Sequence, residues 1–474
     1  MCCGKIPWGI EFGQQLTKPT FQPNIIPIET SRQPTDIFST LLQDHETAFI
    51  LESVEGPQRL ARYSLLGFEP QATIRVDQKR AEILDRVKGD RRIISCENPL
   101  NLLSSQLRQS GTNDRSDRYN GGLVGYASYD LVSYLERLPR GRPSEGGFPD
   151  LEFGLFEDGI VFDHFKRRTY YFHRDENRID QVKSALEEPS RERSVSFGKP
   201  KSNLDKEQFC KTVSVVKKHI GSGDIFQAVL SKQYRVPFSG SLFPFYKALR
   251  KINPSPYMYY LKFGNRQIIG SSPEMLARKV GKKIETFPIA GTRPFTADPA
   301  RNRAFASDLL HDEKERAEHV MLVDLARNDI GRVADYGTVQ VPEFMRVQRY
   351  SHVQHIVSRV VGRIKRGLSS FDLFRAVFPA GTVTGAPKVR AMEIIGELEP
   401  ANRGPYAGAV GYFSHNGNAD FAITILTLCA QNNRCYIQSG SGIVADSVPK
   451  QEWYESERKA AALFTAMNIA QEVE

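Results

Sequence analysis

The chain has 474 residues but only six cysteines and two tryptophans, and it contains no long hydrophobic run. The cysteines are Cys2, Cys3, Cys96, Cys210, Cys429 and Cys435. They lack the C-x-x-C spacing of a zinc site and imply no disulfide framework in a chain of this length, so we expect reduced thiols. None lies in a Gly-x-Cys-x-Gly setting, which exposes a nucleophile on a sharp strand-to-helix turn. We therefore predict no built-in cysteine amidotransferase.

The apolar runs fall short of the roughly 18 residues that a membrane span needs. Residues 1–5 lead into no apolar core of a signal peptide, so we expect a cytoplasmic protein without membrane association. A hydrophobic content of 40% and a charged content of 25% are typical of a globular α/β or α+β protein. At roughly 150 residues per domain, the length allows about three units or two large ones.

Basic residues outnumber acidic ones by 64 to 55, which gives a net charge of +9. This balance permits an anionic ligand or a nucleic acid and requires neither. In the densest basic run, residues 346–366, the apolar Val353, Ile356 and Val360 indicate a strand whose charges form a solvated edge. We therefore expect no nucleic-acid partner, and salt-sensitive binding to RNA or DNA would contradict that expectation.

A polar segment with two prolines, residues 186–204, is the best linker candidate. It separates two regions with different patterns of apolar residues. In the first region, residues 1–185, the alternation and glycine punctuation of an antiparallel, partly buried sheet extend from about residue 38 to residue 171. Residues 205–474 alternate longer helices with strands, as an α/β domain does. The predicted strands include 48–53, 72–76, 121–126, 258–263 and 421–428, and the predicted helices include 204–222, 312–328 and 449–467.

Two pairs of glutamates have a spacing that suits a metal site. Glu315 and Glu318 begin one predicted helix, and Glu452 and Glu455 lie near the start of another, where the helix dipole favours carboxylates. A spacing of three residues turns both side chains toward one helix face, where they repel unless a cation lies between them. Mg²⁺ prefers carboxylate oxygens and leaves room for an anionic substrate. For either pair alone, a solvated, charged helix face is the simpler interpretation.

Two glycine-containing segments are candidates for ligand contacts. Residues 381–388 precede a predicted helix, whose first N–H groups bind anions well, but a plain helix start explains the pattern equally well. A Walker A loop would require Gly-Lys-Ser/Thr, which is missing. Residues 440–445 match the dinucleotide pattern loosely, yet too little chain follows for its second strand. We exclude a nicotinamide enzyme, and a close approach of this backbone to a small ligand stays open.

His355 shares one face of a predicted strand with Val357 and Arg359. A lone strand histidine is more often a hydrogen-bonded structural group than a catalyst. The near-neutral pKa of histidine nevertheless makes His355 the natural general acid if it faces the metal pocket.

Six motifs follow one another in a characteristic order: residues 223–227, 272–274, 288–294, the Glu318 segment, 381–392 and 440–459. Together they resemble the chorismate-utilising enzymes, and among these the component I subunits of anthranilate synthase. The resemblance covers nearly the whole chain. It implies an α/β (α+β) fold of two large domains, with mostly antiparallel sheets packed as a sandwich and helices outside. It makes residues 1–185 a tryptophan-binding regulatory region and 205–474 the chorismate-binding catalytic domain.

The resemblance also implies which residues form the site. Glu318 and Glu455 would bind Mg²⁺ with support from Glu315 and Glu452, and His355 would assist loss of the chorismate C4 hydroxyl group. The other implied positions are Gln227 and Thr382 as catalytic residues, Gly291, Thr292, Tyr406, Gly440, Gly442 and Lys459 around the substrate, and Ser53, Asn253, Pro256, Tyr257 and Met258 around tryptophan. A proline-fixed turn before a core strand would also explain residues 253–258.

The implied activity is a Mg²⁺-dependent lyase reaction that turns chorismate and ammonia into anthranilate and pyruvate, the first step of tryptophan biosynthesis. Tryptophan would inhibit it by feedback, and a separate glutamine amidotransferase subunit would supply the ammonia. Gln227 favours ammonia, because the water-using relatives carry a lysine base there. Ala290 favours anthranilate, because aminodeoxychorismate synthases typically carry a lysine there that attacks the substrate.

One position departs from the family pattern. The arginine that clamps a substrate carboxylate in the family falls on Leu426 in this chain. Loss of a bidentate charged partner costs roughly several kcal/mol of binding where nothing replaces it. Two alternatives to anthranilate synthase therefore stay open, namely an aminodeoxychorismate synthase component I and a catalytically impaired protein that binds chorismate or tryptophan for regulation.

Overall fold

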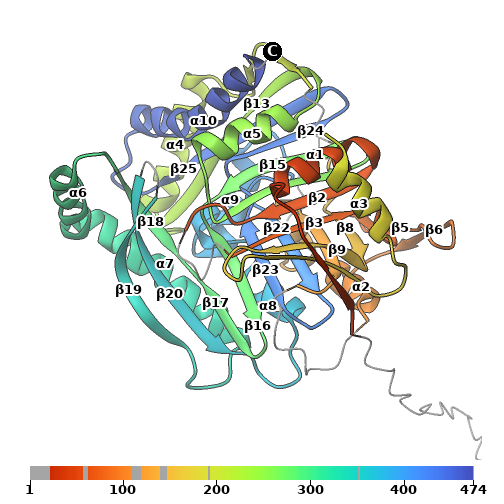
Figure 1. Cartoon of the computed structure of the whole chain (residues 1–474). Helices are drawn as coiled ribbons and strands as arrows, with labels where there is room; N and C mark the ends of the chain where they lie inside the picture. The colour runs from red at the N-terminus through yellow and green to blue at the C-terminus, as the bar shows by residue number, and fades with distance from the viewer. Residues whose placement is uncertain are drawn as a thin grey trace, which may run out of the picture.

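A computed structural model describes residues 22–56, 62–108, 119–138, 147–189, 193–350 and 353–472. Two large antiparallel sheets face one another, and helices cover their outer faces (Figure 1). This arrangement confirms the predicted class, an α/β (α+β) fold with a sandwich of antiparallel sheets. No helix in these described ranges is long and apolar enough to cross a membrane.

The first sheet has 13 strands among the described residues. Its order is β1 (Asn24–Ile28), β10 (Arg168–His173), β9 (Asp158–Asp163), β3 (Tyr63–Phe68), β2 (Thr47–Glu52), β14 (Tyr257–Phe263), β15 (Arg266–Ser272), β24 (Thr427–Gln431), β25 (Arg434–Ile443), β13 (Gln227–Gly240) and β11 (Val195–Phe197). Two short strands, β12 (Lys201–Ser202) and β21 (Gly385–Ala386), also pair with β13.

The second sheet has 12 strands on the same basis. Its order is β18 (Ile289–Pro294), β20 (Val353–Arg363), β17 (Lys283–Thr286), β16 (Met275–Val280), β23 (Ala419–Ile423), β22 (Ala409–Ser414), β7 (Gly122–Ala127), β8 (Leu151–Phe156), β4 (Ala72–Asp77), β5 (Arg80–Asp85) and β6 (Asp90–Ser95), with β19 (Gln340–Arg349) paired to β20.

Ten α-helices and two 3₁₀ turns complete the described chain. They are α1 (Pro34–Asp44), α2 (Pro99–Gln106), α3 (Ile179–Glu187), α4 (Lys206–Gly221), α5 (Phe243–Ile252), α6 (Pro299–His311), α7 (Glu313–Val333), α8 (Ser370–Val377), α9 (Lys388–Leu398), α10 (Pro449–Gln471), η1 (Tyr129–Tyr134) and η2 (Gly381–Val383). The predicted helices 204–222, 312–328 and 449–467 correspond to α4, α7 and α10.

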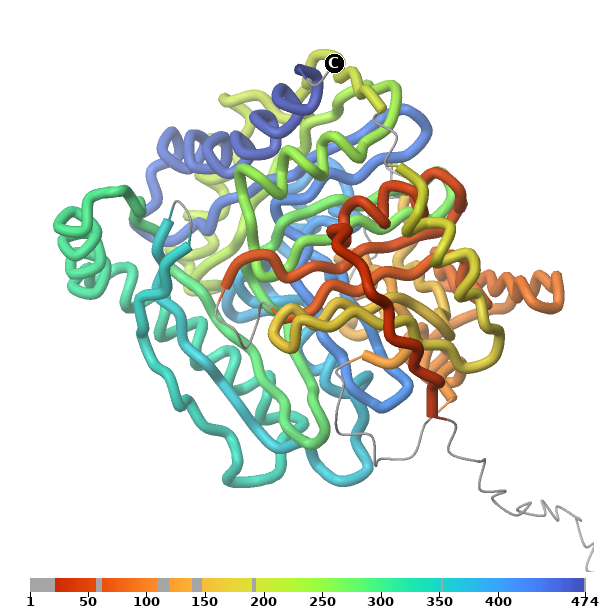
Figure 2. Tube along the Cα trace, in the orientation of Figure 1, coloured from red at the N-terminus to blue at the C-terminus, as the bar shows by residue number. Residues whose placement is uncertain are grey.

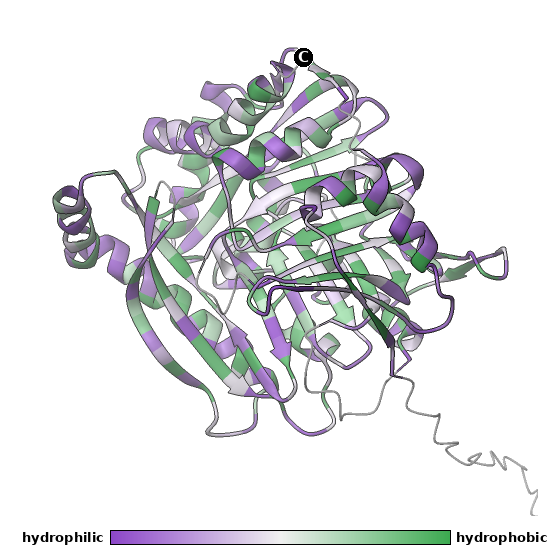
Figure 3. Cartoon of the chain, in the orientation of Figure 1, coloured by the Kyte–Doolittle hydropathy of each residue, from purple (hydrophilic) through white to green (hydrophobic). Residues whose placement is uncertain are grey.

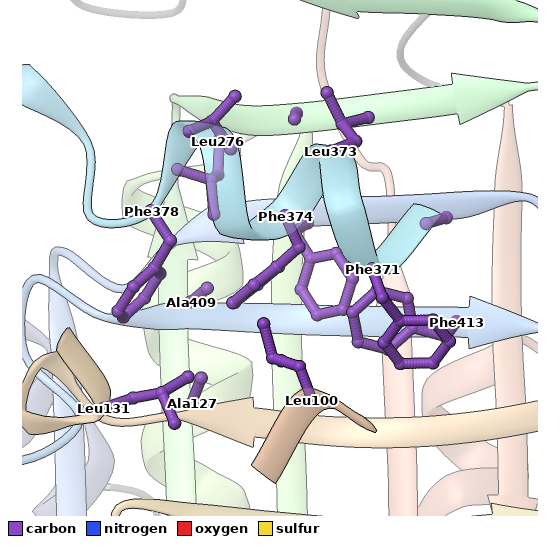
Figure 4. Close-up of a cluster of buried hydrophobic side chains, with 14 of the residues drawn as sticks. Leu100, Ala127, Leu131, Leu276, Phe371, Leu373, Phe374, Phe378, Ala409 and Phe413 are labelled. Atoms are coloured by element: carbon purple, nitrogen blue, oxygen red, sulfur yellow. The ribbon is translucent and has the colours of Figure 1, made fainter. Parts of the chain in front are cut away.

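Three apolar layers hold the sandwich together. An aromatic-rich layer lies between the sheets and includes Tyr126, Tyr259 and Tyr412. A second layer packs α1, α3, α5 and α10 on the outer face of the first sheet. A third packs α2, α7 and α8 on the second sheet, where Phe371 and Phe374 of α8 lie over Phe413 of β22 (Figure 4). Figure 3 shows this pattern as green strands beneath helices whose outer faces are purple.

Both sheets combine strands from the two halves of the chain. In the first, β2 pairs with β14, and in the second, β7 pairs with β22, so early and late segments lie side by side (Figure 2). The predicted linker, residues 186–204, contributes the short strands β11 and β12, which pair with β13. A division into a regulatory region, a linker and a catalytic domain stays a prediction about function, because the sheets continue across it.

The predicted single strand 421–428 is wrong. Ile423 ends β23 in the second sheet, and Thr427 begins β24 in the first, so the chain crosses between the sheets at residues 424–426. Leu426 takes a φ of 48°, a left-handed conformation that is uncommon for residues other than glycine. Apolar residues continue through this crossing, because both flanking strands are buried. The sequence pattern therefore gave no signal of the break.

Candidate active site

Three chain segments meet at Gln227, the first residue of β13. Its Nε2 atom donates a hydrogen bond of 3.2 Å to Oε1 of Glu318 on α7. Gly442 near the end of β25 lies beside it, since a Cβ atom at Gly442 would come within 2.6 Å of the same Nε2 atom. The structure thus brings together Gln227, Glu318 and Gly442, as the sequence predicted, and a side chain at residue 442 would displace the amide.

Helix α10 adds Glu455 and Lys459 to this place. The two side chains form an ion pair of 2.8 Å, and Nζ of Lys459 donates to the Gly440 carbonyl oxygen at 3.2 Å. Burial raises the pKa of Glu318, the neighbouring charge of Glu315 raises it further, and Gln227 and the charges of Lys314 and Lys459 oppose the rise. The ammonium group of Lys459 on α10 therefore lies close enough to Glu318 on α7 for its charge to act on the carboxylate.

The start of α7 fixes the first pair of glutamates. Asp312 caps the helix by accepting hydrogen bonds from the backbone N–H groups of Lys314 and Glu315, at 3.0 and 3.1 Å. Glu315 then forms an ion pair of 3.2 Å with Arg293. Its Oε2 atom would lie 3.0 Å from a Cβ atom at Gly291, where φ is +66°. Glycine therefore suits residue 291 for both backbone conformation and space.

His355 on β20 lies on the Gly291 side of the site. Its Nδ1 atom is 2.8 Å from the Gly291 carbonyl oxygen and 3.1 Å from Oγ1 of Thr292. The carbonyl oxygen can only accept, so Nδ1 carries the proton and Nε2 of the neutral ring is left as an acceptor. Burial lowers the pKa of His355. The role of His355 as the acid that assists loss of the C4 hydroxyl group stays a prediction.

Glu274, just before β16, is the ionisable residue that sequence reasoning did not assign. It is 7% exposed, and burial raises the pKa of its carboxyl to about 8, against the opposing effects of the Thr382 hydroxyl and the Lys459 charge. Glu274 and Thr382 line one cavity of about 390 Å³ beneath η2 and beside α7. The motif at residues 272–274 was visible in the sequence, but burial, which makes this carboxyl an acid at neutral pH, was not.

Tyr406 and Leu426 are two further positions that the sequence analysis connects with the substrate. Tyr406 is buried, and burial raises the pKa of its hydroxyl to about 12. It belongs to the same apolar cluster as Val383, the neighbour of Thr382. The backbone at Leu426 lies next to β15, because the Ser271 N–H donates to the Leu426 carbonyl oxygen at 3.2 Å.

The four predicted metal ligands do not form a ready-made cluster. Within the described ranges, no group of three or more His, Cys, Asp or Glu side chains is placed to hold one ion. Glu315, Glu318 and Glu455 contact Arg293, Gln227 and Lys459 respectively. Glu452 is 6% exposed, and its Oε2 atom has no hydrogen-bond partner among the described residues. The orphaned buried oxygen of Glu452 and the repulsion between Glu315 and Glu318 are features that a hard cation such as Mg²⁺ would relieve, and a magnesium site at these residues stays a prediction.

A second, larger cavity of about 610 Å³ lies between the two sheets. Three of the five residues predicted for a tryptophan site, Ser53, Tyr257 and Met258, line it together with Glu52 and Asp420, and binding of tryptophan there stays a prediction. Asn253 and Pro256 are not among its lining residues. Asn253 instead donates to Oγ of Ser271 at 3.0 Å and so supports the turn before β14.

Comparison with known proteins agrees with this geometry. A sequence model of the chorismate binding enzyme family matches residues 46–465. Anthranilate synthase component 1 of Methanothermobacter marburgensis is 48% identical over 442 residues, which cover 93% of this chain and 94% of that protein. Aminodeoxychorismate synthase component 1 of Bacillus subtilis is 41% identical over 455 residues, covering 92% of this chain and 94% of that protein.

Solved structures show the same fold. The crystal structure of anthranilate synthase component I from Streptococcus pneumoniae superposes with a TM-score of 0.78 at 36% identity, covering 86% of this chain and 93% of that chain. The menaquinone-specific isochorismate synthase of Escherichia coli superposes with a TM-score of 0.71 at 19% identity, covering 94% of this chain and 95% of that chain. At that identity the second match supports the fold alone.

Proposed function

The chain belongs to the chorismate-binding enzyme family, and from that premise we propose that it is component 1 of an anthranilate synthase. In this reaction chorismate and ammonia give anthranilate, pyruvate and water. The observation that carries the proposal is the neutral amide of Gln227, hydrogen-bonded to Glu318 and packed against Gly442. An amide at this place cannot act as the base that would activate water, so ammonia is the better nucleophile for this site.

Glu318 and Glu455, with Glu315 and Glu452 beside them, are the residues that would hold Mg²⁺. The bound ion would bind a carboxylate of chorismate and offset its negative charge. The fit rests on the orphaned Oε2 atom of Glu452 and on the raised pKa of Glu318. Lys459 would attract the dianionic substrate, since its ammonium group pairs with Glu455 at 2.8 Å and its charge acts on both Glu318 and Glu274.

Glu274 is the residue best suited to protonate the C4 hydroxyl group as it leaves. With a pKa of about 8, most of its carboxyl carries a proton at pH 7. Thr382, which lines the same cavity, would orient the substrate against it. His355, neutral and donating from Nδ1 to the Gly291 carbonyl oxygen, would present Nε2 as a hydrogen-bond acceptor instead.

The cavity between the sheets is the proposed site of feedback inhibition by tryptophan. Its lining combines aromatic side chains with the carboxylates of Glu52 and Asp420, which suits an amino acid that carries an apolar ring and an ammonium group. Asp420 already accepts from Tyr257 at 2.9 Å, so a ligand on Asp420 would contact the strand β14 that Tyr257 begins.

Ammonia would come from a separate glutamine amidotransferase in the cytoplasm. The relatives are named component 1, which implies a second component, and the sequence contains no cysteine in a nucleophile turn. The second candidate function is an aminodeoxychorismate synthase, favoured by the 41% identical Bacillus subtilis relative. Ala290 carries no amine to attack chorismate, which disfavours it.

The test is to incubate the purified chain with chorismate, Mg²⁺ and an ammonium salt at neutral pH, where Glu274 is mostly protonated, and to identify the product by fluorescence and mass. Anthranilate supports the proposal. Aminodeoxychorismate would select the second candidate. Conversion by neither route, with chorismate or tryptophan still bound, would show that the chain is a regulatory protein without catalysis.

A further inference from the structure

Arg403, in the connection between α9 and β22, is a charged residue buried directly beneath the candidate site. It is 2% exposed and is one of the largest fully buried side chains in the described structure. A buried guanidinium needs partners for its five N–H donors, and these partners come from separate parts of the chain. Arg403 belongs to none of the motifs that indicated the site from the sequence.

The guanidinium joins two segments that carry candidate site residues. Its Nη1 atom donates to the carbonyl oxygen of Val383, the residue after Thr382, at 2.7 Å. Its Nη2 atom donates to the carbonyl oxygen of Val229 on β13, two residues from Gln227, also at 2.7 Å. One rigid, planar group therefore sets the spacing between the Thr382 turn and the strand that begins at Gln227.

Glu399 makes the link to β13 stronger. It accepts two hydrogen bonds from Arg403, from Nε at 2.9 Å and from Nη2 at 2.7 Å. The same carboxylate accepts from the backbone N–H and the hydroxyl of Ser231, at 2.8 and 2.7 Å. The ion pair thus contacts β13 at two successive positions on one side of the strand, Val229 and Ser231.

The third connection is to Tyr406. The guanidinium carbon lies 5.8 Å from the centre of the Tyr406 ring and 4.6 Å from that of Tyr129, within the range of a cation–π contact. Tyr406 follows Arg403 by three residues, and the turn between them is anchored by the Gly404 N–H, which donates to Asp130 at 3.0 Å. Tyr406 is thereby held relative to both Thr382 and Gln227.

We propose that Arg403, paired with Glu399, is a positioning residue for the reaction. It fixes Gln227, Thr382 and Tyr406 relative to one another and touches neither substrate itself. The inference rests on the proposed function, because it assumes that these three residues face chorismate and ammonia. A misplacement of about 1 Å at a reacting group lowers a rate by about 10²-fold. We expect an effect of this size if the planar guanidinium group of Arg403 is lost.

The chain offers a matched control for a purely structural role. Arg266 and Glu152 form another bidentate pair, at 2.8 and 2.6 Å, with side chains 14% and 5% exposed. This pair links β15 to β8, and its further hydrogen-bond partner is the hydroxyl of Tyr126, which is not a candidate site residue. Replacing either arginine by lysine keeps the charge and removes the planar fork.

The experiment compares R403K and R266K for kcat, for KM of ammonium and chorismate, and for the unfolding temperature. We expect R403K to lower kcat about 10²-fold and to raise KM for ammonium at a temperature where both variants are fully folded. R266K should retain the kinetic constants of the unsubstituted chain. Equal kinetics of R403K and the unsubstituted chain, or equal losses in both variants, would overturn the inference.

Two further measurements cover the remaining outcomes. If R403K does not fold, E399Q keeps the shape of the partner and removes one acceptor, and the same kinetic comparison applies to it. Chorismate binding by calorimetry requires no turnover, so it separates this inference from the proposed function. Weaker binding in R403K than in R266K supports positioning even in a chain that makes no anthranilate, and equal binding contradicts it.

Discussion

Glu274 offers the sharpest test of the proton chemistry. Its pKa moves from an ordinary 4.5 to about 8, and at 1.36 kcal/mol per tenfold change this disfavours the ionised carboxylate by about 5 kcal/mol. At pH 7 about nine-tenths of the side chain is therefore protonated and able to donate. We predict that Glu274→Gln, which keeps the shape and removes the acid, lowers kcat by about 10²-fold to 10⁴-fold.

The pH dependence gives the same prediction a second readout. Because the folded-state pKa lies above the unfolded value, the stabilisation from the protonated form is complete below pH 4.5 and is lost as pH rises through about 8. The unsubstituted chain should lose thermal stability between about pH 4.5 and 8 and should lose activity as pH rises through about 8, and Glu274→Gln should remove the stability loss. Glu285 is a buried carboxyl group for comparison, because its pKa is shifted in the opposite direction. Burial raises the pKa of Glu285, but the contacts with Arg359, Arg278 and Lys283 outweigh this effect and lower the pKa.

Two assays check these statements, namely a profile of kcat against pH and unfolding temperatures from pH 4 to 10. Retention of kcat within about threefold in Glu274→Gln would contradict a role for Glu274 as the general acid, because loss of a general acid has a far larger effect. Persistence in that variant of the stability loss between about pH 4.5 and 8 would contradict the raised pKa of Glu274.

Three further predictions concern the other parts of the site. Gly442→Ala places a Cβ atom 2.6 Å from the Gln227 amide and should lower kcat/KM for ammonium by about 10²-fold. The unfolding temperature should change little, because the clash is with the flexible end of a side chain. An unchanged kcat/KM would exclude Gln227 from the ammonia path. Leu426→Arg should lower KM for chorismate at least about tenfold, as measured by initial rates, and an unaltered KM would mean that another group binds that carboxylate. Ser53→Phe fills part of the cavity between the sheets and should raise the tryptophan concentration for half-inhibition about tenfold. The inhibition is measured relative to the uninhibited rate of the same variant. Unchanged inhibition would mean that tryptophan binds elsewhere.

The fold was predictable where periodic patterns continue through one element. Helices α4, α7 and α10 lie in the predicted ranges, and their starts carry local features that the structure shows, such as the Asp312 cap of α7 and Pro449 at the start of α10. The crossing at residues 424–426 was not predictable, because both flanking strands are apolar and the change of sheet depends on distant partners. For the same reason residues 186–204 read as a linker, although β11 and β12 pair there with β13.

In the candidate site, too, some residues were predictable from the sequence and others were not. Spacing within the sequence identified Glu315 with Glu318 and Glu452 with Glu455, and the structure brings Gln227, Gly442 and Lys459 toward them. Glu274 and Arg403 escaped prediction because their roles depend on burial, which raises the pKa of one and surrounds the other with backbone carbonyl groups. Neither property is encoded in neighbouring residues.

Anthranilate formation depends, as proposed, on one Mg²⁺ that is bound by two glutamates, one from α7 and one from α10. The most direct measurement follows anthranilate fluorescence while Mg²⁺ is titrated into chain freed of metal, with chorismate and ammonium present, for the unsubstituted chain and for Glu318→Ala. We predict no anthranilate before Mg²⁺ is added, a saturable rise in the unsubstituted chain, and none in Glu318→Ala. Anthranilate formed without a divalent cation, or formed equally by both chains, would contradict the claim.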